Sequence, residues 1–142
     1  MKRAVLDASV IMKWYLFDEA YGEKALALLK RFTLGDLDII APALLTYELM
    51  NGLLIACRRG RLDDKALVSS LEGFMNLGIR LFDVSSHYDR VIHYCRVYER
   101  SVYDSCYLAL AEHEETVLIT ADERLFNRVG TELAWVQFLR GS

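Results

Sequence analysis

The chain has 142 residues, of which 54% are hydrophobic, and it contains one proline and eight glycines. That size and composition suit one packed domain over residues 1–142, and no apolar run is long enough to span a bilayer. The formal net charge is −3, which excludes a protein that grips nucleic acid by overall basicity. A polyanionic partner would therefore need a local basic patch or a bound cation.

The N-terminus and the cysteines indicate the compartment. Asp7 comes too early for a secretory signal, so we expect a cytoplasmic protein. Cys57, Cys95 and Cys106 are odd in number and far apart, and they form no Cys-x-x-Cys pair. We therefore expect buried free thiols, and we expect neither a disulfide framework nor a zinc site.

Hydrophobic periodicity predicts strands that alternate with helices along the whole chain. Ala25, Leu28, Leu29 and Phe32, for example, follow a helical period, and Pro42 suits the first turn of a helix. In chain order, the predicted elements are a strand over 3–6, helices over 10–17 and 21–32, a strand over 37–41, helices over 42–57 and 63–77, a strand over 80–84, helices over 86–100 and 102–114, a strand over 116–119, a helix over 122–129 and a strand over 134–136. This alternation predicts a doubly wound α/β domain with a parallel sheet covered on both faces.

The predicted topology places four acidic residues at one edge of the sheet. Asp7 ends the first strand, and Asp122 lies just past the fourth. Glu48 lies in the second turn of the helix that leaves the second strand, and Asp104 in the first turn of the helix leading to the fourth. Crossover helices run antiparallel to the strands, so their N-terminal turns lie along the edge formed by the carboxyl ends of the strands, where such folds bind ligands. We therefore expect these four carboxylates to meet.

A group of four carboxylates is costly without a counter-ion. At about 6 Å and an effective dielectric of about 20, each of the six pairs costs about 3 kcal/mol, for a sum on the order of 17 kcal/mol. That sum rivals the stability of a whole domain. Because Mg²⁺ and Mn²⁺ prefer oxygen ligands, the cluster predicts a divalent metal site.

Each acid also has a structural explanation. Asp7-Ala8-Ser9 fits a turn and helix N-cap, Ser101 to Asp104 and Thr120 to Glu123 each fit a capping box, and Glu48 fits a partly exposed helix residue. A first-turn acid can cap a helix and still face the edge of the sheet, so the two readings are compatible. Convergence of all four acids favours the functional one.

These acids lie within segments that carry a family resemblance. The segments are Val5–Ser9, Glu48–Leu53, Tyr103–Ala111 and Thr120–Leu125. In order, they resemble the motifs of PIN-domain nucleases, in particular the toxin component of VapBC-type toxin–antitoxin modules. The likeness spans nearly the whole chain, and the ordered set is more specific than any single motif.

The resemblance implies a PIN-like three-layer α/β/α sandwich with a central parallel sheet and RNA cleavage that depends on Mg²⁺ or Mn²⁺. It also implies a homodimer and a small antitoxin partner. The residues that match the family's acidic quartet are Asp7, Glu48, Asp104 and Asp122, those that match its hydroxyl-bearing helpers are Ser9 and Thr120, and Asn51 matches its polar neighbour. Cys106 departs from the pattern, which has a smaller residue such as alanine there, and this departure affects packing and not chemistry.

A mechanism follows as a hypothesis from these matches. Asp7 and Asp104 would hold a metal ion, and Glu48 and Asp122 would complete its site. The ion would activate water for in-line attack on a phosphodiester. No histidine is required, and His87, His93 and His113 are expected to be ordinary helix residues.

Two further clusters stand out in the sequence. The densest basic one comprises Arg58, Arg59, Arg61 and Lys65. It fits an RNA-backbone contact, but a solvated helix end is slightly favoured. The aromatic one comprises Trp14, Tyr15, Phe17 and Tyr21. Most of its members are expected in the core, and any exposed one would suit a partner surface.

Other functions fit the sequence less well. A haloacid dehalogenase-type phosphatase needs a second acid two residues after the first, where this chain has Ser9. A receiver-like phosphoacceptor needs paired early acids and a late lysine at a strand end, where this chain has Thr120-Ala121-Asp122. The alternative from another class is a non-catalytic PIN-like module that binds RNA or a protein partner.

Overall fold

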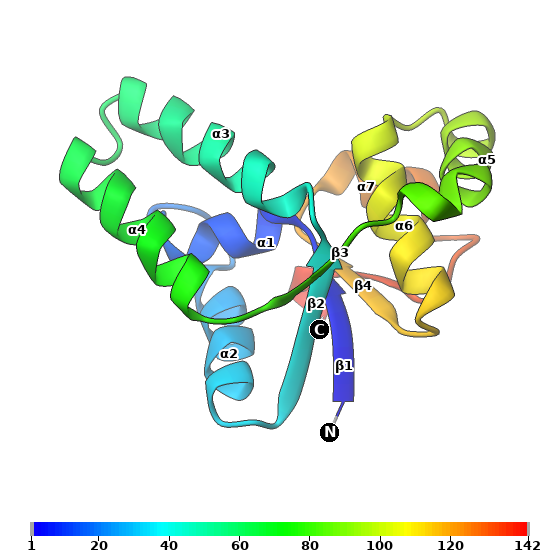
Figure 1. The fold of residues 1–142 in the computed structure, drawn as a ribbon, viewed down its shortest axis with the longest axis horizontal. Coiled ribbons are helices and arrows are strands. Elements are labelled where there is room, and N and C mark those ends of the chain that lie inside the picture. Colours follow the sequence, from blue (N-terminus) through cyan, green and yellow to red (C-terminus); the bar gives the residue numbers. More distant parts are fainter. Residues whose placement is uncertain (1, 142) are drawn as a thin grey trace.

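A five-stranded parallel sheet forms the centre of the computed structural model, which describes residues 2–141 (Figure 1). The strands are β1 Lys2–Leu6, β2 Leu37–Pro42, β3 Arg80–Phe82, β4 Val117–Thr120 and β5 Val136–Phe138. Their order in the sheet is β3-β2-β1-β4-β5, and every neighbouring pair is parallel. The first and fourth strands of the chain therefore lie side by side, although more than a hundred residues separate them.

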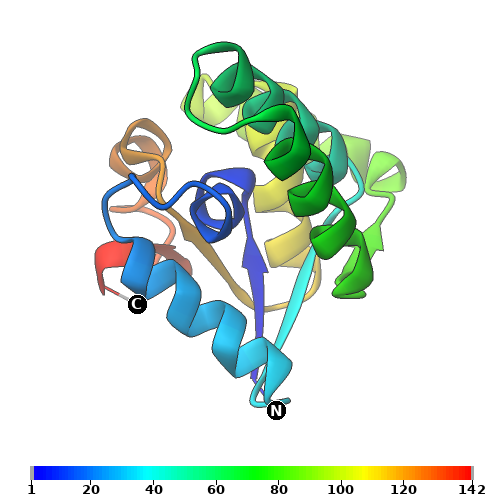
Figure 2. The same cartoon turned by 90° about the vertical axis from the view of Figure 1, so that its left-hand side faces the viewer.

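Helices connect these strands and cover both faces of the sheet. They are α1 Ala8–Ile11, α2 Gly22–Thr33, α3 Leu45–Arg58, α4 Asp64–Asn76, α5 Tyr88–Tyr98, α6 Val102–His113 and α7 Glu123–Val129, with short 3₁₀ turns at Met12–Trp14, Ser85–His87 and Leu139–Gly141. On one face α2 packs against β2 and α1 against β4, while on the other α6 packs against β1, β2 and β4 and carries α5 on its outer side (Figures 1 and 2). This arrangement confirms the predicted three-layer α/β/α sandwich with a parallel sheet.

The helices α3 and α4 form a hairpin that extends away from the sheet (Figure 1). The helix α7 contacts the end of α5, where the Arg128 Nε atom donates a hydrogen bond to the Tyr98 carbonyl oxygen at 3.0 Å. No helix within residues 2–141 is long and apolar enough to cross a membrane.

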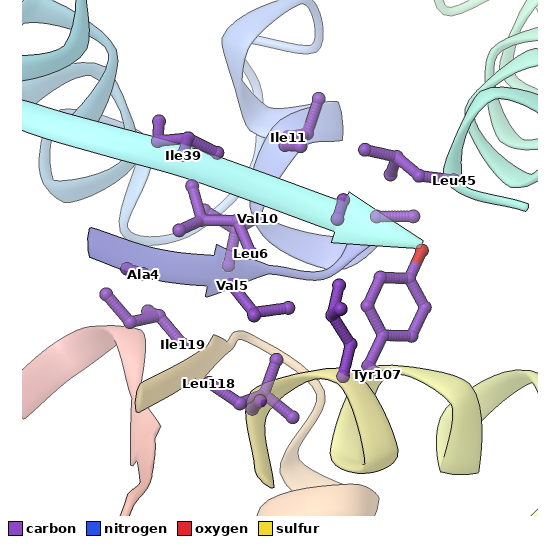
Figure 3. Packing of buried hydrophobic residues seen from close by; sticks show 14 of the residues in the cluster. Ala4, Val5, Leu6, Val10, Ile11, Ile39, Leu45, Tyr107, Leu118 and Ile119 are labelled. Atoms are coloured by element: carbon purple, nitrogen blue, oxygen red, sulfur yellow. The ribbon is translucent and has the colours of Figure 1, made fainter. Parts of the chain in front are cut away.

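The core lies on both faces of the three central strands. Val5, Leu6, Ile39 and Leu118 are fully buried, and Figure 3 shows their side chains between the two helical layers. Short apolar stretches buried on both faces are typical of parallel strands. Because the apolar character stops where β1 and β4 end, the first polar residues beyond them lie at the edge of the sheet.

The structure corrects several predicted boundaries. Pro42 ends β2 and does not begin a helix, because β2 continues pairing with β3 up to Pro42 and Phe82, and α3 begins only at Leu45. Glu48 consequently lies in the first turn of α3 and not in the second. The helix predicted over 10–17 begins earlier, at Ala8, because Asp7 is its N-cap. It ends in the 3₁₀ turn at Trp14. The last strand, predicted over 134–136, begins at Val136.

The single domain predicted over 1–142 stays a prediction, since residues 1 and 142 lie outside the described part of the chain.

Candidate functional site

The four predicted acids all lie in segments at the carboxyl ends of the strands. Asp7 follows β1 and is the N-cap of α1, and Asp122 follows β4 and is the N-cap of α7. Glu48 and Asp104 lie in the first turns of α3 and α6. The structural explanation therefore holds at Asp7, which caps α1 as predicted and also stands at this edge. Asp122 caps α7 itself, in place of the predicted cap at Thr120.

Asp7 is the most buried of the four acids, with 6% of its surface exposed. Its Oδ1 atom accepts hydrogen bonds from the Ser9 amide at 3.1 Å and the Ser9 hydroxyl at 2.5 Å, and its Oδ2 atom accepts one from the Thr120 hydroxyl at 2.5 Å. All of these donors are neutral. A carboxylate offers about four lone-pair positions, so this arrangement leaves room for a further ligand.

The two hydroxyls that hold Asp7 are themselves oriented by the backbone. The Ser9 hydroxyl accepts from the Ala121 amide at 2.9 Å, and the Thr120 hydroxyl accepts from the Asp122 amide at 3.0 Å. Each hydroxyl hydrogen is therefore directed at Asp7. Ser9 and Thr120, which the sequence predicted as helpers, thus fasten the end of β1 to the end of β4.

The environment of Asp7 disfavours its charged form. Burial raises the pKa of Asp7 to about 7, the hydrogen bonds from Ser9 and Thr120 oppose that rise, and the nearby charges of Asp122 and Asp104 add to it. A buried carboxylate whose neighbours are hydroxyls and other acids is costly unless a cation joins it.

Glu48 reaches across from α3 to α6. The Tyr107 hydroxyl donates to its Oε1 atom at 2.6 Å, and Figure 3 shows the Tyr107 ring extending from α6 toward the end of β2. Burial raises the pKa of Glu48, the bond from Tyr107 lowers it, and the charge of Asp104 raises it further.

Asp104 has a cationic partner on the preceding loop. The Arg100 Nε and Nη2 atoms each lie 3.2 Å from the Asp104 Oδ2 atom. Burial nevertheless raises the pKa of Asp104; Arg100 opposes the rise and the charge of Asp122 adds to it. The Asp104 backbone amide donates to the Ser101 hydroxyl at 3.0 Å, which confirms that Ser101 caps α6.

Asp122 caps α7 with the Oδ1 atom, which accepts from the Arg124 amide at 2.9 Å and the Leu125 amide at 3.3 Å. The predicted capping box from Thr120 to Glu123 is wrong, because Asp122 and not Thr120 is the N-cap. The Thr120 hydroxyl is used instead to hold Asp7.

The structure thus links the four acids as one electrostatic group. Asp104 is coupled to Asp7, Glu48 and Asp122, and Asp7 is coupled to Asp122 as well. Over residues 2–141, however, no three His, Cys, Asp or Glu side chains converge into a ready-made metal site. Asn51 is exposed on α3, three residues beyond Glu48, and its predicted place beside the site stays a prediction.

Sequence reasoning missed two residues at this edge, Tyr107 and Arg100. Tyr107 lies three residues after Asp104 and is almost completely buried, with 2% of its surface exposed. The spacing places it next to Asp104 on one face of a helix, which was a usable signal. Arg100 precedes Asp104 by four residues but lies outside the helix, so no periodicity pointed to it.

The histidines and the basic and aromatic clusters noted in the sequence contribute no side chain to the acidic group described above. His113 ends α6 at the end opposite Asp104, and its ring lies 4.1 Å from that of His87. Arg61 is engaged by Asp18 and Glu19, at 2.7 and 3.1 Å. Among the four predicted aromatic residues, Trp14 is buried, Tyr15 and Tyr21 are half-buried against the core, and Phe17 is 78% exposed. The three cysteines are free thiols, as predicted, but only Cys106 is buried, whereas Cys57 and Cys95 are half-buried.

Fold and site together define an α/β/α sandwich protein whose carboxyl-end edge is built from acidic residues. Comparison with known proteins gives the family. The sequence profile of the PIN domain matches residues 4–132. The chain therefore belongs to the PIN domain family.

Solved structures share this fold. The chain is similar to PAE2754 from Pyrobaculum aerophilum, with a TM-score of 0.70 and 24% identity over 99% of this chain and 92% of that one. It is also similar to VapC20 of Mycobacterium tuberculosis, a sarcin-ricin loop cleaving toxin, with a TM-score of 0.61 and 15% identity over 87% of this chain and 93% of that one. At these identities the likeness describes the fold. No curated protein matches the chain in sequence.

Proposed function

We propose that this protein is a metal-dependent endoribonuclease that hydrolyses RNA phosphodiester bonds at its acidic edge. The observation that carries the proposal is the state of Asp7. It is buried, its hydrogen-bond donors within the described chain are neutral, and its charged neighbours are Asp104 and Asp122. Membership of the PIN domain family, whose members are generally nucleases, supports the same conclusion.

The donor set fits Mg²⁺ or Mn²⁺. The four acids offer only oxygen ligands, which these hard cations prefer. Three of the acids (Asp7, Glu48 and Asp122) receive hydrogen bonds from neutral groups, so their negative charge is unbalanced.

In this proposal Asp7 and Asp104 hold the ion, and Glu48 and Asp122 complete the site directly or through water. When bound, the ion supplies Lewis-acid stabilisation of the charge on the scissile phosphate. The chain's own contribution is rigidity, because Ser9 and Thr120 fix the Asp7 carboxylate and Tyr107 fixes Glu48. Fixed carboxylates need little rearrangement when an ion and a phosphate arrive.

We further propose that the protein is the toxin of a toxin–antitoxin pair, acts in the cytoplasm and forms a homodimer. The structural likeness to VapC20 supports a toxin that cleaves RNA. Exposed apolar side chains support protein partners: Val68 and Met75 lie on α4, and Tyr88 and Ile92 lie on α5. Size-exclusion chromatography with light scattering tests the dimer, and co-purification with the product of the adjacent reading frame tests the antitoxin.

The central experiment incubates the purified protein with end-labelled RNA in Mg²⁺ or Mn²⁺, and then with excess EDTA. We expect cleavage with either ion, loss of cleavage in EDTA, and loss in Asp7→Asn. Asp36→Asn is the matched control, because Asp36 is exposed in the turn before β2, at the opposite edge of the sheet. RNA binding without cleavage, unchanged by EDTA, would support the non-catalytic PIN-like module instead.

A further inference from the structure

Arg100 is a positive charge within the acidic edge. It lies in the loop between α5 and α6, and 20% of its side chain is exposed, similar to the 25% of Asp104. Both its Nε and its Nη2 atoms approach the same oxygen, Oδ2 of Asp104. Within the described chain the other oxygen, Oδ1, receives no hydrogen bond, so Asp104 offers one free oxygen to a ligand.

The charge of Asp104 acts on two of the other three acids. It raises the pKa of Glu48 and of Asp7, and the charge of Asp122 raises the pKa of Asp104 itself. If Asp104 bridged two cations, it would use both of its oxygens, and one of them is occupied by Arg100.

The net charge of the acidic edge also favours one bound divalent ion over two. Four carboxylates and one guanidinium leave three negative charges at the edge. One divalent ion reduces them to a single negative charge, whereas a second would make the half-buried edge positive before any phosphate arrives. Uncompensated charge of either sign is costly where water is partly excluded.

We propose that Arg100 restricts this site to one divalent ion per chain, by occupying Oδ2 of Asp104 and by supplying the positive charge that a second ion would bring. This inference rests on the proposed metal site and deepens it. Arg100 acts through Asp104 and is therefore a positioning residue.

The test counts bound ions and needs no RNA. Mn²⁺ is titrated into the purified protein at low ionic strength, and free Mn²⁺ is followed by its electron paramagnetic resonance signal. We expect one tightly bound ion per chain in the wild type and in Arg100→Lys, which keeps the charge. We expect two in Arg100→Met, with the first bound about tenfold more tightly.

Arg90→Met is the matched control, because Arg90, on α5, pairs with Glu112, which lies on the same helix as Asp104 but away from the acidic edge. It should bind one ion, and far-ultraviolet circular dichroism should show that each variant is folded. If Arg100→Met does not fold, Arg100→Gln replaces it: two ions are expected in Arg100→Gln and one in Arg100→Lys.

Two results would overturn the inference while leaving the proposed function intact: two ions bound by the wild type, or one ion bound by Arg100→Met. If the wild type bound no ion, or if Asp7→Asn bound ions as the wild type does, the proposed metal site itself would fail and the inference with it.

Discussion

The two ends of α6 each carry an acid paired with an arginine, and the two pairs differ. Glu112, in the last turn, accepts from Arg90 on both oxygens, at 2.7 and 3.0 Å, and also from the Tyr94 hydroxyl. Chiefly because of Arg90, the pKa of Glu112 is lowered. Asp104, in the first turn, accepts from Arg100 on one oxygen only, and burial raises its pKa.

The difference separates an acid that stabilises the fold from one that is available to a ligand. At Glu112 both oxygens are used and the charge is balanced, so the pair joins α5 to α6. At Asp104 one oxygen remains free, and the charges near it other than Arg100 are negative. A carboxylate with an unused oxygen and negatively charged neighbours lowers the stability of the fold. Such a cost is a common property of functional sites.

The largest expected effect tests this contrast on activity. Asp104→Asn should lower the rate of RNA hydrolysis about 1,000-fold, since several kcal/mol of transition-state stabilisation depend on the ion that it helps to hold. Glu112→Gln should change the rate less than about twofold and lower the free energy of unfolding by about 1 kcal/mol, because the pair is partly exposed. Initial rates and urea unfolding measure the two effects; equal losses of activity would refute the contrast.

Asp7 extends the contrast to an acid with no cationic partner in the described chain. Its pKa is raised to about 7, so between about pH 4 and 7 the native state binds more protons than the unfolded state. The stability of the metal-free protein should therefore fall as pH rises through that window. Asp7→Asn should remove this fall and stabilise the metal-free protein at pH 8 by on the order of 2 kcal/mol. Thermal unfolding in EDTA at pH 5 and pH 8 measures the difference, and a variant less stable than wild type at pH 8 would contradict it.

A smaller effect is expected from the two tyrosines that hold acids. Tyr107→Phe removes the hydrogen bond to Glu48 and should lower the rate of RNA hydrolysis about tenfold, as loss of a residue supporting a metal ligand commonly does. Tyr94→Phe removes the analogous bond to Glu112 and should leave the rate unchanged. Rates at saturating Mn²⁺ distinguish them, and similar rates for both variants would argue against a role for Glu48.

The smallest effect concerns the C-terminal end of α6. Glu115 has a φ of 51° and closes the helix with bonds from the Thr116 amide to the Ala111 carbonyl and from its own amide to the Glu112 carbonyl. This backbone conformation favours glycine. Glu115→Gly should raise the free energy of unfolding by about 1 kcal/mol without changing hydrolysis. Urea unfolding measures the gain, and a loss would show that the Glu115 side chain stabilises the fold.

Much of this architecture was predictable from the sequence because it depends on local pattern. Short apolar stretches between periodic helices indicated a parallel α/β sheet, and that topology brought the segments of Asp7, Glu48, Asp104 and Asp122 to one edge. Pro42 was misplaced because a proline fits a helix start and a strand end equally well, and only pairing with β3 decides between them.

The support around the acids was less predictable, because the partners come from different elements. The Tyr107 bond to Glu48 spans 59 residues, and the Thr120 bond to Asp7 spans 113. Hydropathy and helical periodicity do not specify such long-range polar pairs. The family resemblance pointed to Ser9 and Thr120. The pairing of Arg100 with one oxygen of Asp104 is visible only in the three-dimensional structure.

The junction between the ends of β1 and β4 has a consequence for biosynthesis. Asp7 leaves the ribosome early, whereas Thr120, whose hydroxyl it requires, leaves near the end of translation. Until that residue emerges, β1 lacks one of its two neighbouring strands, and the Asp7 carboxylate lacks one of the three hydrogen bonds that it accepts within residues 2–141. An incomplete chain therefore cannot assemble the acidic edge, and under the proposed function a nascent polypeptide would gain nuclease activity only when its synthesis is almost complete.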